Sequence, residues 1–304
     1  MKIVVTGGAG FIGKSFLKLC NAKGHDTVLV DSITYAGSLE GTPKSTTYIL
    51  EDINKVKAKW IKDADYIVNF AAETHVDNSI KNGNPFVKSN VNGVFNLLEV
   101  SRNLPKLKKF IQISTDEVYG DLHLLDKLES NEKDTLHPSS YYSATKAAAD
   151  MLVMSCNHTY GLPYLITRTC NNFGDTQHSE KFIPTIARNI VENKPVPLYG
   201  DGEQIREWIW VEDNVRIIYD LMFKKEGIWN IGSGKEGRWK NNQIIKYISK
   251  MLDKKVIVDY VEDRKGHDKR YSLDINKLKT EYIYEPIVTK SLKTFLEEVY
   301  GQNN

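Results

Sequence analysis

The glycine-rich stretch VVTGGAGFIG, at residues 4–13, constrains the fold of this chain more than any other part of the sequence. It continues a short apolar run, and Gly7, Gly10 and Gly13 have the spacing G-x-x-G-x-x-G. Such glycines permit a tight turn, a close approach of pyrophosphate to the backbone, and close packing of helix on strand. A helix that starts here also offers free N–H groups to a phosphate. The stretch predicts a strand–turn–helix unit that binds a dinucleotide; a purely structural turn is the competing interpretation.

Short apolar runs alternate with amphipathic stretches of helical length in the first half of the chain. The predicted strands are Lys2–Thr6, Thr27–Asp31, Thr46–Ile49, Tyr66–Phe70, Phe110–Ser114 and Tyr164–Arg168. The predicted helices are Gly10–Lys23, Phe86–Arg102 and Ser143–Tyr160. Strands rich in Val and Ile that are separated by helices predict a parallel sheet covered on both faces, with right-handed crossovers. The expected fold class is α/β, with a Rossmann-like doubly wound parallel sheet.

The rhythm of the sequence changes after about residue 170, where prolines, paired glycines and aromatic residues become more frequent. We therefore expect an NAD-binding Rossmann domain over residues 1–170, to which a segment of about 207–231 returns. Residues 171–304 are expected to form a smaller α/β lobe that binds the substrate. Ligands of such folds lie at the carboxyl ends of the strands, so the site is predicted where the two parts meet.

Composition excludes several classes of partner. The chain has 304 residues, with 41 basic and 39 acidic side chains and a net charge of +2, so no nucleic-acid or membrane-surface partner is expected. No apolar run approaches the roughly 20 residues of a transmembrane helix, and no signal peptide is recognisable. The cysteines Cys20, Cys156 and Cys170 form no metal or disulfide pattern. A cytoplasmic protein without a metal ion is the prediction.

A carboxylate at the end of the second predicted strand selects between the dinucleotides. Asp31 lies 18 residues past Gly13, where a carboxylate accepts both ribose hydroxyls and repels a 2′-phosphate, so NAD is favoured over NADP. The stretches EDI and FAAETH are expected near the adenine and the pyrophosphate. The predicted cofactor-binding residues are Gly7, Gly10, Phe11, Ile12, Gly13, Asp31, Asp52, Ile53, Ala71, Ala72, Tyr142 and Lys146.

Two adjacent acids, Asp116 and Glu117, follow the predicted buried strand in ISTDEVYGD. Adjacent carboxylates repel each other, and burial costs free energy unless they are hydrogen-bonded or one keeps its proton. One interpretation is a solvated loop that caps the next helix. The other is a general acid beside a general base, since adjacent carboxyls push their pKa values apart.

Tyr142 and Lys146 in YYSATKAAAD lie four residues apart, which places them on one face of a helix. A lysine ammonium beside a phenol favours the phenolate, so we expect a lowered pKa for Tyr142 and a role as a base. Such a pair alone is weak evidence, because aromatic and lysine residues often share a helix face. Tyr141 offers a competing register but has no lysine at the fourth position after it.

Taken together, these motifs resemble the extended short-chain dehydrogenases/reductases, and within them the nucleoside-diphosphate-glucose 4,6-dehydratases. The resemblance runs from Met1 to about Leu278. The matching stretches are TGGAGFIG, DSITYAGSLE, AAETHVDNSI, ISTDEVYGD, YSATKAAAD, RTCNNFG, EKFIP, PLYGDGEQIREWIWVED, NIGSG and DRKGHDKRYSLD. STDEVYG discriminates best, because epimerases and decarboxylases of this superfamily typically lack the adjacent Asp-Glu pair.

The resemblance implies the dehydration of dTDP-glucose to dTDP-4-keto-6-deoxyglucose with recycled NAD, in a homodimer. Tyr142 would take the proton of the sugar 4-hydroxyl while C4 gives hydride to NAD⁺, with Thr115 on the 4-oxygen. Glu117 would abstract the C5 proton and Asp116 would protonate the departing 6-hydroxyl before hydride returns to C6. The implied catalytic residues are Thr115, Asp116, Glu117, Tyr142 and Lys146. The dimer would form through the helices Phe86–Arg102 and Ser143–Tyr160.

The resemblance also implies a substrate-binding set in which cationic and amide side chains hold the diphosphate. This set consists of Thr115, Asn171, Asn172, Glu180, Lys181, Arg206, Asn230, Arg264, His267 and Tyr271. Of these, Asn172, Arg206 and Asn230 are expected near the diphosphate.

Departures from the family pattern leave the nucleobase open. The loop from Gly120 to His137 is shorter than usual, and Tyr141 stands where a proline often precedes the catalytic tyrosine. UDP-glucose is therefore the second candidate substrate, since thymine and uracil differ by one methyl group, worth only about 1–3 kcal/mol. The motifs also leave open a sugar-nucleotide 4-epimerase or decarboxylase, a generic alcohol dehydrogenase, and a non-catalytic NAD-sensing protein on the same fold.

Overall fold

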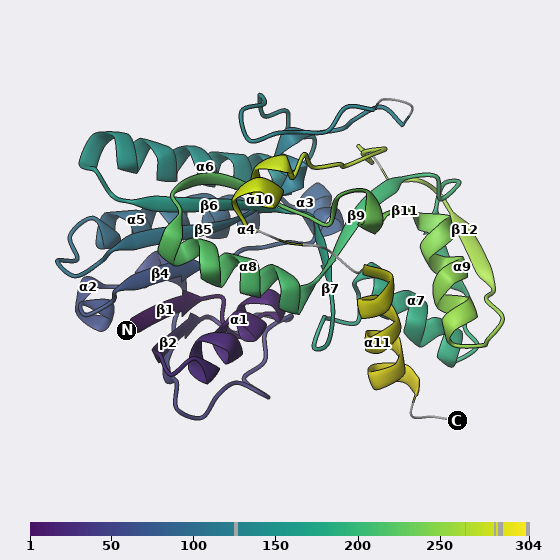
Figure 1. Ribbon diagram of the computed structural model, residues 1–304, viewed down its shortest axis with the longest axis horizontal. Helices are drawn as coiled ribbons and strands as arrows, with labels where there is room; N and C mark the ends of the chain where they lie inside the picture. Colours follow the sequence, from purple (N-terminus) through teal and green to yellow (C-terminus); the bar gives the residue numbers. More distant parts are fainter. Residues whose placement is uncertain (125–126, 265, 283, 285–287, 302–304) are drawn as a thin grey trace.

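The computed structural model describes residues 1–124, 127–264, 266–282, 284 and 288–301. A seven-stranded sheet has the order β10-β6-β5-β4-β1-β2-β3, and every neighbouring pair is parallel (Figure 1). Its strands are β1 (Lys2–Thr6), β2 (Asp26–Asp31), β3 (Thr47–Leu50), β4 (Tyr66–Asn69), β5 (Lys109–Thr115), β6 (Tyr164–Thr169) and β10 (Gly227–Ile231). The predicted Rossmann-like doubly wound α/β fold is confirmed, and the ends of the six predicted strands differ from prediction by at most one residue.

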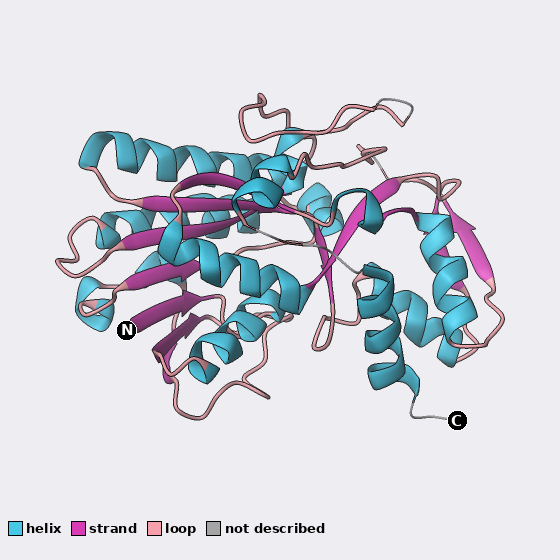
Figure 2. Ribbon diagram, in the orientation of Figure 1, coloured by secondary structure: helices cyan, strands magenta, loops and turns pink. Residues whose placement is uncertain are grey.

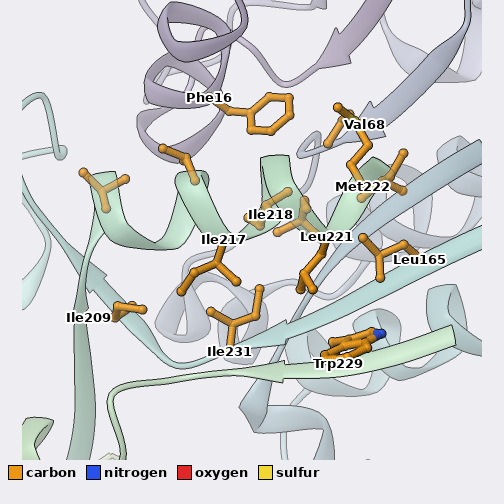
Figure 3. Close-up of a cluster of buried hydrophobic side chains, with 14 of the residues drawn as sticks. Phe16, Val68, Leu165, Ile209, Ile217, Ile218, Leu221, Met222, Trp229 and Ile231 are labelled. Carbon is orange, nitrogen blue, oxygen red and sulfur yellow. The ribbon is translucent and has the colours of Figure 1, made fainter. Parts of the chain in front are cut away.

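Helices cover both faces of this sheet. One face packs against α1 (Phe11–Ala22) and α8 (Val211–Lys224), and Figure 3 shows Phe16 of α1 and Met222 of α8 near Val68 of β4. The other face packs against α5 (Val94–Ser101) and α6 (Tyr141–Tyr160) through a second apolar cluster. Each face of the sheet is thereby removed from water, which explains the nearly continuous apolar character of its strands.

The predicted helix Phe86–Arg102 is divided into three parts. A short α4 (Asn84–Phe86) leads into a wider turn of π type, η2 (Val87–Gly93), before α5 begins. Gly93 lies at the end of the wide turn, where an added Cβ would come within 2.5 Å of the Ile53 side chain. Any larger residue at this point would therefore have to displace the Ile53 side chain of η1 (Ile53–Lys55).

The rest of the chain forms a second, smaller packing unit with its own apolar cluster, to the right in Figure 2. Its helices are α7 (Phe182–Val191), α9 (Asn241–Met251) and α11 (Val288–Tyr300). Its strands are β7 (Asn171–Phe173), β9 (Ile205–Trp210) and β11 (Arg238–Lys240) in one sheet, and β8 (Val196–Tyr199) with β12 (Val258–Val261) in another. The short elements elsewhere are α2 (Ala58–Ile61), α3 (Val76–Lys81), η3 (Asp116–Tyr119), η4 (Gly234–Gly237) and α10 (Asn276–Glu281).

Strand β10 lies within the segment 207–231 and pairs with β6, so this part of the later chain joins the large sheet. The assignment of residues 1–170 to NAD and of 171–304 to the substrate remains a prediction. A search of the described helices finds none that is long and apolar enough to cross a membrane.

Candidate active site

A cleft with a volume of about 740 Å³ opens at the carboxyl ends of the sheet strands. Its walls come from the β1–α1 turn, from the ends of β2, β4 and β5, from the start of α6, and from the second packing unit. Every residue predicted for the cofactor, the chemistry or the substrate lines this cleft, with the exception of Asn230. Among the described residues, no group of three or more His, Cys, Asp or Glu could hold a metal ion.

The glycines of the β1–α1 turn have two roles: Gly7 and Gly13 permit close backbone packing, and Gly10 leaves the start of α1 open to the cleft. Gly7 has a φ of +69°, and an added Cβ would lie 2.5 Å from the backbone nitrogen of Ala71. A Cβ on Gly13 would lie 2.2 Å from the carbonyl oxygen of Gly7, so helix and turn touch at this point. Gly10 is the N-cap of α1, and its Cβ would meet only the Gly7 carbonyl, at 3.3 Å. The start of α1 therefore presents backbone N–H groups to the cleft with no side chain in the way.

Asp31 is held rigidly at the end of β2. Its Oδ2 accepts a hydrogen bond from Ala9 N at 3.0 Å, and its Oδ1 accepts one from Ile33 N at 2.8 Å. Each carboxylate oxygen can accept further hydrogen bonds, so the side chain suits a pair of ribose hydroxyls. The open helix start, the fixed carboxylate and the neighbouring Ala71 and Ala72 fit a dinucleotide without a 2′-phosphate.

The adjacent acids are not a solvated capping loop. Strand β5 is buried along its whole length, and Thr115 caps η3 by accepting a hydrogen bond from Glu117 N at 3.3 Å. Asp116 is 3% exposed, and its Oδ2 is buried without a hydrogen-bond partner among the described residues. Thr115 Oγ1 donates to the other carboxylate oxygen of Asp116 at 3.2 Å.

Burial gives the two acids unequal proton affinities. Burial, followed by the neighbouring Glu117 charge, raises the pKa of Asp116 well above its usual range. Burial also raises the pKa of Glu117, but Arg206, Arg264 and Lys181 oppose this rise. Asp116 is therefore the better holder of a proton, and Glu117 the better base.

Helix α6 carries Tyr142 and Lys146 into the cleft. The helix begins with a capping box between Ser140 and Ser143, which fixes its first turn beside the acids. Tyr142 is 9% exposed and lines the cleft, whereas Tyr141 is 63% exposed, so Tyr142 is the inward tyrosine. Lys146 Nζ donates to the carbonyl of Ile113 at 2.5 Å, and burial lowers its pKa to about 8. The expected lowering of the Tyr142 pKa is not found, because burial and the Glu117 charge raise it.

The second packing unit contributes a fixed guanidinium. Arg206 on β9 is 6% exposed, and its Nη1 and Nη2 donate to the carbonyls of Ile205 and Asp268, each at 2.9 Å. Its guanidinium carbon lies 4.5 Å from the centroid of the Tyr271 ring. The Tyr271 hydroxyl donates to the Asp268 carboxylate, so ring and guanidinium are held as a unit. Arg206 is therefore ready to meet an anion without reorganisation.

The remaining predicted substrate residues line the same part of the cleft. Asn171 and Asn172 lie on β7, and Lys181 is the N-cap of α7. Burial lowers the pKa of Lys181, while the carboxylates around it, Glu180 first among them, act in the opposite direction. His267 bonds the Asp263 carboxylate at 2.5 Å, and burial lowers its pKa to about 4, so its ring is neutral at pH 7.

The structure does not bring Asn230 to the cleft. Asn230 is fully buried in β10, and its Nδ2 donates to the Ser130 carbonyl at 2.8 Å while its Oδ1 accepts from the Tyr119 hydroxyl at 2.8 Å. Its amide is thus occupied inside the protein and does not line the cleft. Asn241, at the start of α9, does line it, directly after strand β11 pairs with β9 at Trp239 and Arg206. Sequence reasoning missed Asn241, although a polar residue at a helix start after an aromatic strand was a readable signal.

Comparison with known proteins places the chain in a family. The sequence model of the family described as "NAD dependent epimerase/dehydratase family" matches residues 3–232 of this chain. This protein belongs to that family. A dTDP-glucose 4,6-dehydratase of Haemophilus influenzae is 39% identical over 95% of this chain and 94% of its own length. The low-salt glycan biosynthesis protein Agl12 of Haloferax volcanii is 42% identical, with 92% of each chain covered.

A solved structure of this epimerase/dehydratase family supports the same grouping. DesIV, a dTDP-glucose 4,6-dehydratase from Streptomyces venezuelae with NAD and dTDP bound, superposes with a TM-score of 0.92. It is 35% identical, and the match covers 100% of this chain and 98% of that one. The predicted relationship to the dTDP-glucose 4,6-dehydratases is confirmed at the level of the family and the fold.

Proposed function

We propose that this protein dehydrates dTDP-glucose to dTDP-4-keto-6-deoxyglucose and that it uses NAD, which is restored in each turnover. The observation that carries the proposal is the adjacent acid pair of buried Asp116 and partly buried Glu117, which lines one cleft together with Tyr142 and Lys146. Elimination of water uses a protonated acid beside a base, whereas a 4-epimerase or a simple alcohol dehydrogenase releases no water. The relationship to named dTDP-glucose 4,6-dehydratases supports the same activity.

The cofactor is assigned to the sheet side of the cleft. Gly7, Gly10 and Gly13 leave room for the pyrophosphate at the start of α1, and Asp31 takes the adenosine ribose hydroxyls. Phe11, Ile12, Asp52, Ile53, Ala71 and Ala72 complete this side. Lys146 holds the nicotinamide ribose. The chemistry that NAD supplies when bound is acceptance of hydride from C4 and its return to C6.

The acid pair performs the elimination. Tyr142 takes the proton from the sugar 4-hydroxyl, and Thr115 hydrogen-bonds the same oxygen. Burial raises the pKa of Tyr142, and Lys146, one turn later on α6, carries a positive charge at neutral pH. Glu117 removes the C5 proton, and Asp116 gives its proton to the departing 6-hydroxyl. This step requires one carboxyl that keeps its proton and one that ionises more easily, and the pKa of Asp116 is raised further than that of Glu117.

The substrate is assigned to the opposite wall. Its diphosphate meets Arg206, and Asn241 takes the place that the sequence had suggested for Asn230. Asn172 lines the cleft here too, but its side-chain amide bonds the Cys170 carbonyl and the Asn214 amide, so it would need to exchange these contacts to reach the diphosphate. Asn171, Glu180, Lys181, Arg264, His267 and Tyr271 line the rest of this wall. Residues 1–170 together with β10 would accordingly bind NAD, and most of 171–304 the sugar nucleotide. UDP-glucose is the second candidate substrate.

We also propose a homodimer and a cytoplasmic location. Large apolar side chains are exposed along η2, α5 and α6, among them Val87 at 46%, Phe95 at 54% and Met151 at 47%. Such a face on neighbouring helices suits contact with a second copy. The three cysteines are buried and unpaired, which fits a reducing compartment.

The deciding experiment is mass spectrometry of products formed in D₂O from dTDP-glucose and, separately, from UDP-glucose. We expect loss of one water and uptake of one solvent deuterium, with no net production of NADH. The substrate that is converted faster identifies the preferred nucleobase. An unchanged mass with a new galactose epimer would overturn the assignment of Asp116 and Glu117.

A further inference from the structure

Asp77 joins the two walls of the cleft. It lies in the first turn of α3, which follows the stretch after β4 and so belongs to the sheet side of the molecule (Figure 1). Its Oδ1 accepts a hydrogen bond from Arg264 Nη1 at 3.3 Å, and its Oδ2 accepts one from the Tyr199 hydroxyl at 3.3 Å. Arg264 and Tyr199 belong to the opposite wall, and all three residues line the cleft. The Asp77 carboxylate therefore connects the two walls of the cleft through hydrogen bonds.

Arg264 is only partly satisfied by this contact. Its side chain is 23% exposed, and its Nε is buried without a hydrogen-bond partner among the described residues. A buried charged donor that lacks a partner is costly, and an anion in the cleft would remove the cost. The other guanidinium in the cleft, on Arg206, is fixed by backbone carbonyls and by the Tyr271 ring. Arg264 instead forms its ion pair with the Asp77 carboxylate.

A guanidinium on a long side chain has many rotamers, and it binds an anion well only when it is held in one of them. A carboxylate that occupies one Nη edge leaves the Nε edge available for a second oxyanion. Such an arrangement orients the guanidinium toward the ligand, while the carboxylate lies at the other edge and stays away from the ligand. The single contact from Tyr199 fixes the carboxylate in turn.

We propose that Asp77 is a positioning residue for the substrate diphosphate: by holding Arg264 at Nη1, it sets the remaining edge of the guanidinium to bind the phosphate oxygens. This inference rests on the proposed function, because it takes a nucleoside diphosphate as the ligand. It assigns to α3, on the cofactor side of the cleft, a part in substrate affinity. Asp77 itself does not touch the substrate.

The test compares dTDP with thymidine, which shares the base and the deoxyribose but lacks the diphosphate. Binding of both to the NAD-loaded enzyme is measured by competition with dTDP-glucose. Asp77→Ala is expected to weaken dTDP binding by about tenfold, as for loss of one charge-assisted contact, and to leave thymidine within about twofold. KM for dTDP-glucose should rise by a similar factor, while kcat stays within about threefold. Asp77→Asn, which keeps an acceptor atom, should recover part of the affinity.

Two further variants separate a positioning role from general loosening of the cleft. Tyr199→Phe removes the other contact of Asp77 but keeps the ring and the Asp77–Arg264 ion pair, so dTDP affinity should fall by less than about threefold. If Asp77 acts through Arg264, the double variant Asp77→Ala/Arg264→Ala should bind dTDP no more weakly than Arg264→Ala alone.

Three results would overturn the inference while the proposed function stands. They are unchanged or tighter dTDP binding by Asp77→Ala, an equal loss of thymidine and dTDP binding, and additive losses in the double variant. If the wild-type enzyme binds neither dTDP nor UDP and converts neither sugar nucleotide, the proposed function and this inference fail together.

Discussion

At the scale of single residues, Asp116 and Glu117 are neighbours in the chain with different surroundings. Asp116 is enclosed, and burial raises its pKa furthest, whereas three cations of the opposite wall favour the ionised form of Glu117. We predict that Asp116→Asn and Glu117→Gln each lower kcat by about 10²–10⁴-fold, the usual contribution of a general acid or base. They should differ in isotope exchange. In D₂O, Asp116→Asn should still exchange the C5 hydrogen, and Glu117→Gln should not, as measured by NMR of recovered sugar nucleotide. Exchange retained in both variants would contradict these roles.

Lys146 sets a second prediction at this scale, because burial lowers its pKa to about 8 from 10.5. Its ammonium is lost as pH rises through about 8, so we expect kcat to fall above that pH. The contribution of Lys146 to folding stability changes in the opposite direction to kcat. Between about pH 8 and 10.5 the unfolded chain holds the proton that the folded chain has lost, so this group makes unfolding less favourable as pH rises.

The matched control for this pH dependence is Lys146→Arg, whose guanidinium stays charged throughout the range. Its activity should be lower at pH 7 but should lack the fall near pH 8. A fall at the same pH in both proteins would assign the alkaline limb to another group.

At the scale of elements, a buried ion pair ties helix α6 to strand β6. Arg168 Nε donates to Asp150 Oδ2 at 3.0 Å, and the side chains are 2% and 0% exposed. Removing one partner leaves a buried charge, so Arg168→Met should lower the free energy of unfolding by about 3–5 kcal/mol. Urea unfolding measures this. The double variant Arg168→Met/Asp150→Leu removes both charges and should regain much of the loss; a single variant that costs under about 1 kcal/mol would contradict the prediction.

Local signals predicted these elements well where the determinant lies nearby in the chain. The glycines of the first turn and the apolar strands indicated the sheet and α1, whose predicted and observed ends differ by one residue. Helix α6 begins two residues before the predicted Ser143, because Ser140 caps it, and that capping box was readable. The local sequence did not predict the wide turn η2, whose last residue, Gly93, packs closely on Ile53, forty residues earlier in the chain.

At the scale of the whole molecule, the cleft was predictable in position and only partly in membership. Residues after parallel strands must meet at one sheet edge, so the acids, Tyr142 and the glycine turn could be placed together from sequence. The opposite wall could not, because its contacts join distant segments. Asn230 looked suitable from the sequence, but its side-chain amide is hydrogen-bonded to Tyr119 and Ser130 inside the fold. The bond between Asp77 and Arg264 spans 187 positions and has no local signal.

Assembly provides the last prediction, because α5 and α6 lie side by side and expose Phe95 and Met151. The chain has a mass of 34.7 kDa, and we expect light scattering to give about twice that value for the wild type. Phe95→Glu/Met151→Glu places two like charges in an apolar contact and should yield monomers.

The control Ile257→Glu/Tyr260→Glu also introduces two glutamates, at side chains that are 57% and 66% exposed in the second packing unit. It should remain dimeric. A monomeric wild type, or equal behaviour of the two variants, would show that helices α5 and α6 do not form the contact.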